Sequence, residues 1–113
     1  MAKMSKAEIA EEQARIQAAA RAVLVTTGDV QAKYQPVNIV FAVGGSAGGL
    51  FTAASPQQAF EAARAQLQLA AVELGGNAVV YCNFGYHAYT TQNFGCSSNA
   101  FHVSGYGTVV RFV

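Results

Sequence analysis

The chain has 113 residues, of which 52% are apolar and 12% are charged, and its formal net charge is +1 at neutral pH. This length suits one domain with a single modest core, and the apolar content excludes an intrinsically disordered chain. The seven lysines and arginines are scattered, which excludes a duplex nucleic-acid binder, because such proteins need a basic stripe. No apolar run reaches the roughly 18 residues that span a bilayer.

The N-terminal segment favours a cytoplasmic location. Glu8, Glu11 and Glu12 stand where a secretory signal has an unbroken apolar run. No cysteine lies near the N-terminus to accept a lipid. We therefore expect a cytoplasmic protein whose two cysteines are thiols rather than a disulfide.

Charge is distributed unevenly along the chain. Nine of the 13 charged residues lie in positions 1–33, and the remaining 80 residues carry only Glu61, Arg64, Glu73 and Arg111. An ordinary soluble domain carries about 25% charged residues. Because obligate interfaces are depleted in charge, we expect a homo-oligomer that buries much of this surface. The alternative is a surface kept soluble by its Gln, Asn, Ser and Thr residues alone.

The first element expected is a helix at the N-terminus. Ser5 and Glu8 have the spacing of a capping box, and the helix runs to about Arg21. Glu11 and Arg15 stand four residues apart in the favourable order for an ion pair. The apolar stripe of the helix is thin and consists of Ile9, Ile16, Ala20 and Val23. We therefore expect the helix to dock on the body, on a neighbouring subunit or on a partner. The alternative is a frayed helical tail.

Two strands and a glycine-rich loop follow. VLVTT (23–27) and VNIVFAV (37–43) are rich in β-branched residues, which favours strands. GGSAGGL (44–50) precedes a helix but lacks the GK[ST] of a phosphate-binding loop. We interpret it as a flexible connection that allows two backbones to approach closely.

The best-defined element is a helix that begins after Ser55. Pro56 suits its first position, Gln58 completes a second capping box, and Gly75-Gly76 ends it. Two more strands, 77–89 and 99–113, are expected on either side of the turn-rich segment TTQNFGCSS. These elements predict a small two-layer α+β domain.

The terminal hairpin contains both cysteines and both histidines, which makes Cys82, His87, Cys96 and His102 candidate ligands for a transition metal. Their spacing contains no CxxC or CxxH pair. On a regular strand Cys82 and His87 face opposite sides of the sheet. If the hairpin closes symmetrically, His87 lies opposite His102 with Cβ atoms about 5 Å apart.

Two imidazoles make half a site, which Cys96 or a symmetry mate would have to complete. The alternative is that Cys82 is a small buried apolar residue and that the histidines are polar members of a sheet. In that case the protein has no cofactor. We expect no enzyme, because Asp29, Glu61 and Glu73 are the only carboxylates outside the N-terminal helix and none has an evident partner for acid–base or nucleophilic chemistry.

Three segments resemble the YbjQ-like family, whose members are often labelled heavy-metal-binding proteins and to which the RcsF domain is related. They are VTT (25–27), LGGNAVV (74–80) and VSGYGTVV (103–110). The resemblance covers residues 23–113, so residues 1–22 are expected to be a helical extension of this domain.

The resemblance implies a dodecin-like β-α-β-β subunit with extra short strands that assembles into rings, typically pentamers. It implies no catalytic residues. Cys82 and Cys96 fall near the positions where the RcsF-like branch has disulfide-forming cysteines. The TTQNFGCSS segment and the scarcity of charge depart from typical members and suggest a larger assembly, such as stacked rings. The expected function is therefore a non-enzymatic homo-oligomeric scaffold, and the alternative is a metal- or small-ligand-binding module.

Overall fold

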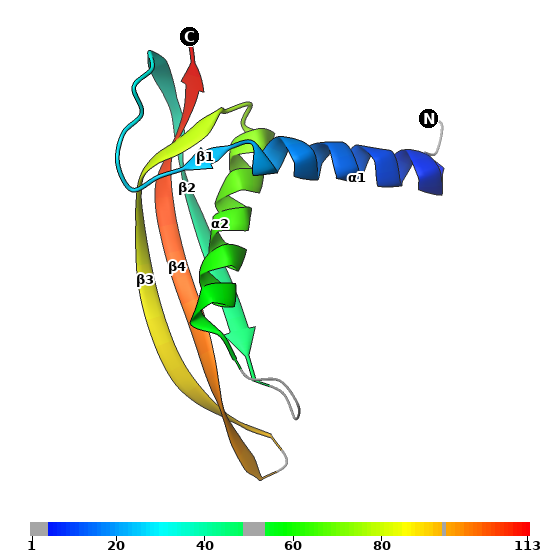
Figure 1. Cartoon of the computed structure of the whole chain (residues 1–113), viewed down its shortest axis with the longest axis vertical. Coiled ribbons are helices and arrows are strands. Elements are labelled where there is room, and N and C mark those ends of the chain that lie inside the picture. The colour runs from blue at the N-terminus through cyan, green and yellow to red at the C-terminus, as the bar shows by residue number, and fades with distance from the viewer. Residues whose placement is uncertain (1–4, 49–53, 94) are drawn as a thin grey trace.

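The computed structural model describes residues 5–48, 54–93 and 95–113, and of residues 91, 93 and 96–98 it describes the backbone alone. Its elements, in chain order, are α1 (Lys6–Arg21), β1 (Leu24–Val25), β2 (Tyr34–Ala47), α2 (Pro56–Glu73), β3 (Ala78–Asn93) and β4 (Cys96–Phe112). Figure 1 shows a long, curved sheet with α2 beside it and α1 projecting to one side.

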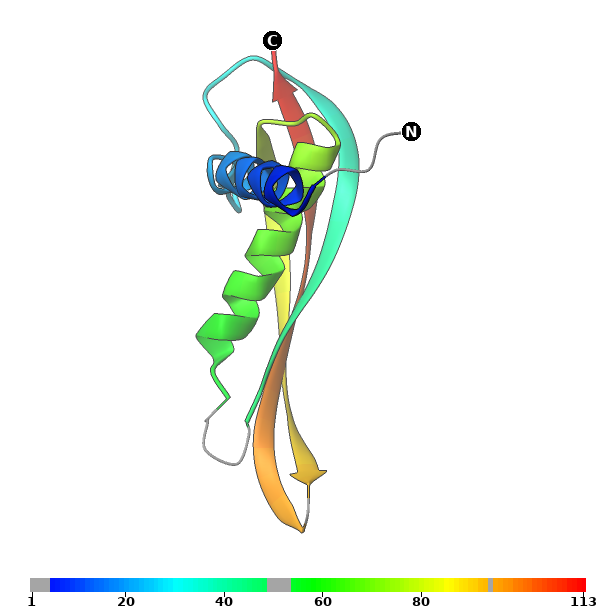
Figure 2. The same cartoon turned by 90° about the vertical axis from the view of Figure 1, so that its right-hand side faces the viewer.

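The four strands form one mixed sheet in the order β1-β3-β4-β2. β1 is parallel to β3, whereas β4 is antiparallel to both β3 and β2. Helix α2 lies against one side of the sheet (Figure 2). The chain is therefore a two-layer α+β domain, as the sequence predicts.

The core between α2 and the sheet is built from small side chains. Ala59, Ala63, Leu67 and Ala71 recur at helical spacing and are fully buried. Gly44 of β2 lies directly beneath the first of these residues, where a Cβ would overlap the backbone of Ala59 and Ala63. The absence of a side chain at position 44 thus allows the helix to approach the strand closely.

A second, smaller cluster lies on the opposite side of the sheet. Ala78, Val80 and Val110 are buried there beneath Val30 and Tyr34. Asp29 fixes the connection between β1 and β2, because its Oδ1 accepts a hydrogen bond from the Tyr34 hydroxyl at 2.7 Å and another from the Val30 N–H at 2.8 Å. The loop before β2 therefore covers this end of the sheet.

Both expected helices are confirmed, including their caps. The Ser5 and Ser55 hydroxyls accept hydrogen bonds from the N–H groups of Glu8 and Gln58. The ion pair of α1 differs from expectation, since Arg15 pairs with Glu12 rather than with Glu11.

The strands differ more from expectation. β1 is only two residues long, not the five of 23–27, and β2 runs on through Gly44–Ala47, which were expected to form a loop. The hairpin strands also extend through most of TTQNFGCSS, up to Asn93 and from Cys96. In both places the partner strand β4 supplies the hydrogen bonds that the local composition did not indicate. Residues 49–50 of GGSAGGL and Phe94 of TTQNFGCSS lie outside the described residues.

Helix α1 touches the body only near its end. Ala20 is buried, and Gln17 and Arg21 face Ala65 and Leu69 of α2 across a shallow cleft. The preceding turns project away from the sheet (Figure 1). Within the described residues, α1 therefore docks by its C-terminal end alone.

The close contact at Gly44 is testable with one methyl group. We expect Gly44→Ala to lower the free energy of unfolding by about 1–3 kcal/mol, because the helix must move away from β2. Gly45→Ala is the matched control, since a Cβ there would meet only the Phe101 carbonyl oxygen at 3.8 Å. Denaturant unfolding measures both; equal stabilities of the two variants would contradict the close contact.

The Asp29 contacts predict an unusual tyrosine titration. The hydrogen bond to Asp29 raises the pKa of Tyr34 to about 12. The Asp29 carboxylate also raises the pKa of Tyr81. The stabilising contribution of Tyr34 should therefore be complete below its ordinary pKa of about 10 and be lost as the pH rises through about 12. In Asp29→Asn we expect both phenols to titrate at a lower pH than in the wild type, because the carboxylate that disfavours their ionisation is gone; phenolate absorbance measures this. Identical titrations of the variant and the wild type would contradict the contact.

Candidate functional site

The side of the sheet that faces away from α2 carries an uncharged surface, here called the open face. Side chains alternate along a strand, so every second residue of β2, β3 and β4 lies on this face. Its members are Ile39, Phe41 and Val43 of β2, Ser104 and Tyr106 of β4, and Asn83, Gly85, His87 and Tyr89 of β3, with His102 of β4 beside His87.

Large apolar side chains of the open face are strongly exposed. Phe41 is 76% exposed, Val43 58% and Ile39 57%, and Tyr106 is 48% exposed beside Phe41, with the two ring centroids 6.3 Å apart. Exposed apolar residues are ordinary when scattered, but contiguous ones mark an interaction surface. The open face is such a contiguous surface.

The middle of the open face is hollow. Gly85, Ser104 and Gly105 contribute little or no side chain there, and the rings of Phe41 and Tyr106 form one wall. The hollow has a volume of about 430 Å³. Asn83 donates a long hydrogen bond of 3.5 Å to the Tyr106 hydroxyl at its edge. A protruding apolar side chain of another molecule would fit this shape.

The two histidines lie side by side at the far end of the open face. The register pairs His87 with His102, which confirms the symmetric closure of the hairpin. Their ring centroids are 5.0 Å apart, and the Tyr89 ring lies 5.9 Å from that of His102. The two imidazoles are close enough to share one ion.

Cys82 is not brought to the histidine pair. It is buried on the side of the sheet that faces α2, in the cluster around Leu67 and Val103, whereas His87 lies on the other side. Burial raises the pKa of the Cys82 thiol, which favours the protonated form. A protonated, buried thiol is neither a nucleophile nor a metal ligand.

Cys96 is also remote from the pair. Its backbone begins β4 opposite Asn93, and it lies six positions before His102 along the strand, or about 20 Å away. The side chain of Cys96 lies outside the described part. The four candidate ligands thus do not meet within one subunit, and among the described residues no group of three or more His, Cys, Asp or Glu could hold a metal.

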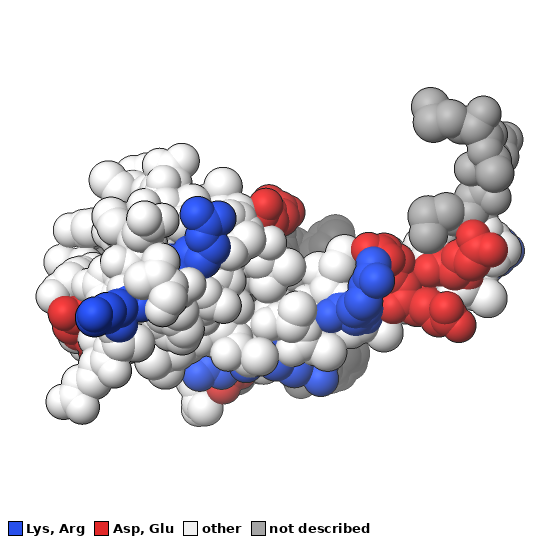
Figure 3. Space-filling model, turned by 90° about the horizontal axis from the view of Figure 1, so that it is seen from above, with Lys and Arg blue, Asp and Glu red and all other residues white. Residues whose placement is uncertain are grey.

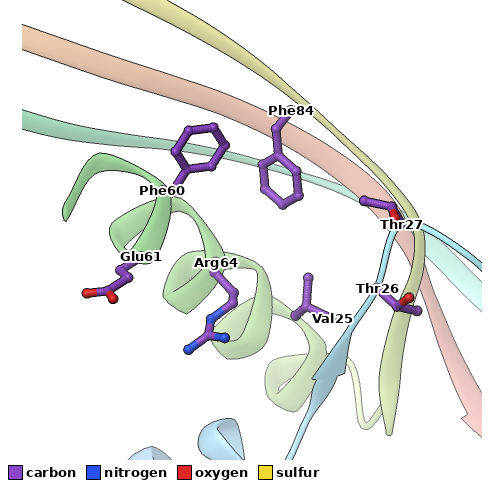
Figure 4. Close-up of a pocket in the computed structure, with 7 residues that line it drawn as sticks. All are labelled: Val25, Thr26, Thr27, Phe60, Glu61, Arg64 and Phe84. Atoms are coloured by element: carbon purple, nitrogen blue, oxygen red, sulfur yellow. The ribbon is translucent and has the colours of Figure 1, made fainter. Parts of the chain in front are cut away.

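A cleft of about 250 Å³ lies between α2, the end of β1 and β3. Figure 4 shows Phe60 and Phe84 turned toward each other, while the charged ends of Glu61 and Arg64 point away from the two rings. The ring centroids are 5.9 Å apart. The cleft is therefore apolar on its inner side, and Thr26 and Thr27 close its other end.

Charged side chains gather away from the open face. Figure 3 shows acidic and basic residues concentrated on the α1 arm, whereas most of the visible body is uncharged. No charged residue occurs between Glu73 and Arg111, a segment that contains all of β3 and most of β4. No helix within the described residues is long and apolar enough to cross a membrane.

The open-face residues of β2 were not recognised from the sequence as site residues. The signal was present in VNIVFAV, where apolar residues occupy both parities of the strand instead of one. In a sheet covered by a helix on one side only, that pattern leaves an apolar face without a partner.

Comparison with models of protein families finds no match, and comparison with curated proteins finds none either. Among solved structures, the chain is similar to a protein of unknown function of the DUF74 family from Pediococcus pentosaceus ATCC 25745. The two sequences are 22% identical, the match covers 80% of this chain and 98% of the other, and the TM-score is 0.58. At this identity the likeness shows a shared fold, and the 113-residue chain therefore has the fold of this DUF74 protein.

Proposed function

We propose that the chain is a non-enzymatic assembly protein, a YbjQ-like subunit that forms a homo-oligomer of one pentameric ring or of stacked rings. The observation that carries the proposal is the open face, where Ile39, Phe41 and Val43 are each more than half exposed with no charge among them. A soluble monomer would place polar side chains on the uncovered side of its sheet.

The shared fold with a DUF74 protein, a family related to YbjQ-like proteins, supports the family part of this proposal. The distribution of charge supports the assembly part, since a sparsely charged body would carry the contacts and the charged α1 arm would keep the assembly soluble. The arm projects away from the body (Figure 1), as expected of a helix that docks on a neighbouring subunit.

The assembly is testable with a single charge on the open face. We expect Phe41→Glu to weaken association at least about 100-fold, because an unpaired carboxylate would be buried between subunits. Native mass spectrometry and analytical ultracentrifugation measure the change. Leu24→Glu is the control, since Leu24 is 52% exposed but lies at the other edge of the sheet. A wild-type monomer, or equal masses for both variants, would contradict the proposal.

A second candidate function is the binding of a transition metal, which is favoured by the paired imidazoles of His87 and His102. A structural zinc site has four protein ligands, so two imidazoles from one subunit would need two more ligands from a symmetry mate, and the site would form between subunits. Cys82 takes no part, since it is buried on the other side of the sheet.

If the histidine pair binds a metal, substitution of a histidine should abolish zinc binding and substitution of Cys82 should not. After exposure to Zn²⁺ and removal of the excess, we expect wild-type protein and Cys82→Ala to retain zinc and His102→Asn to lose it. Elemental analysis measures the zinc content, and the oligomer mass of each variant is recorded alongside. Wild-type protein without zinc would eliminate this function and leave the assembly proposal standing.

A further inference from the structure

We propose that the outer edge of β3, from Phe84 to Thr90, pairs antiparallel with the same edge of a second copy of this chain across a two-fold axis. The inference rests on the proposed assembly function and identifies one of its contacts. Figure 1 shows β3 as the outer strand of the lower half of the sheet, beyond the end of β1.

Hydrogen bonds at the opposite edge of the sheet show which way the backbone groups point. The Gln66 side chain of α2 accepts from the Val43 N–H at 3.1 Å and donates to the Val43 carbonyl at 2.6 Å. Val43 therefore points its N–H and C=O away from β4. Backbone directions alternate along a strand, so Gly44 points toward β4, where it pairs with Val103.

The same alternation continues across β4 into β3. Val103 points toward β2, so His102 points toward β3, where it pairs with His87. His87 in turn points toward β4. The even-numbered neighbours Tyr86 and Ala88 consequently direct their N–H and C=O groups outward, away from the sheet, and so does Phe84.

These outward groups have no strand beside them. The cover that β1 and the following residues give to β3 ends at Cys82, whose N–H donates to the Thr26 carbonyl at 3.0 Å. Beyond that bond, within the part of the chain that the structure describes, no hydrogen bond joins the outer edge at Phe84, Tyr86 or Ala88 to another group. Residues 85–90 are exposed.

The other edge of the sheet is guarded. Along β2, Pro36 has no N–H, the Ile39 N–H is bonded to the Asn38 side chain at 2.8 Å, and Val43 is occupied by Gln66. Such devices protect an edge against an added strand. Pairing of the β3 edge of one subunit with the β2 edge of the next is therefore disfavoured. The β3 edge can instead pair with the β3 edge of a second copy. Two identical edges related by a two-fold axis perpendicular to the strands run antiparallel.

The chemistry of the β3 edge also suits a second copy. Edge strands of monomers are protected by charges, especially lysine, but β3 carries no charge at all. The edge offers aromatic and threonine side chains, which form favourable cross-strand pairs with their like. A charged peptide would find no complement here. Helix α2 leaves room for the added sheet, because it packs chiefly over β2 and β4.

The contact predicts an even number of subunits. A ring closed through other surfaces would be joined to a second ring by these two-fold contacts. The result is a stack of two rings rather than a single ring.

Proline at an outward position tests the contact. Ala88→Pro removes an outward N–H that has no partner in β4, so the subunit should fold while the paired edge loses a hydrogen bond and gains a clash. We expect native mass spectrometry to give half the wild-type mass. Ala47→Pro is the matched control: Ala47 is exposed and has the same outward parity on β2, and this variant should retain the wild-type mass.

Hydrogen exchange of the wild-type protein provides a second measurement that needs no variant. Pairing should slow exchange of the Phe84, Tyr86 and Ala88 amides by about 100-fold or more relative to unprotected amides, as resolved by fragmentation mass spectrometry. Fast exchange at these amides would overturn the inference even if Ala88→Pro failed to fold.

The outcomes separate this inference from the proposed function. A wild-type oligomer with an odd number of subunits, or a folded Ala88→Pro variant of wild-type mass, would overturn the edge pairing and leave the assembly standing. A wild-type monomer would overturn both. An even-numbered oligomer with protected amides, halved by Ala88→Pro and not by Ala47→Pro, would support the pairing.

Discussion

The contact on which the structure depends is the close approach of α2 to β2 at Gly44. Small residues of the helix, above all Ala59 and Ala63, lie directly over a strand position that has no side chain. This contact holds the helix over β2 and β4, and Gln66 anchors it to the edge of β2. The same placement leaves the β3 edge and the open face without cover. The part of the fold that is most tightly packed thus determines which surfaces remain for other molecules.

The sequence predicted the helices better than the strands. Capping serines, Pro56 and Gly75-Gly76 act within a few residues of the helix ends, so local composition defines α1 and α2. Strand ends depend on distant partners. Gly44–Ala47 joined β2 because β4 lies opposite. The histidine pair was predictable because the register of a symmetric hairpin follows from the position of its turn. The hydrogen bonds that protect the β2 edge were not predictable, because they come from Gln66, 23 residues away from Val43 in the chain.

The candidate surfaces differ in whether their side chains could bind an ion. The cleft beside Phe60 and Phe84 is apolar within, and the buried Cys82 thiol has a raised pKa. His87 and His102 are the groups best placed to bind an ion, and they lie on the same open face that carries Phe41 and Tyr106. Assembly and metal binding are therefore compatible on this protein, since a metal between subunits would lie within the proposed contact surface.

One irregularity in β3 has a wider consequence. The register with β4 shifts between Val80 and Asn83, where Tyr81 has a φ of 52° and one extra residue is accommodated. Downstream of this bulge, every side chain of β3 has the opposite orientation to the one it would have on a regular strand. If this segment paired with β4 as a regular strand at its present length, His87 would face the helix and Phe84 and Tyr86 would face the opposite side. The bulge therefore absorbs one residue without moving the downstream faces, and a chain that lacked this residue would place the histidines and the aromatic residues on the same sides as now.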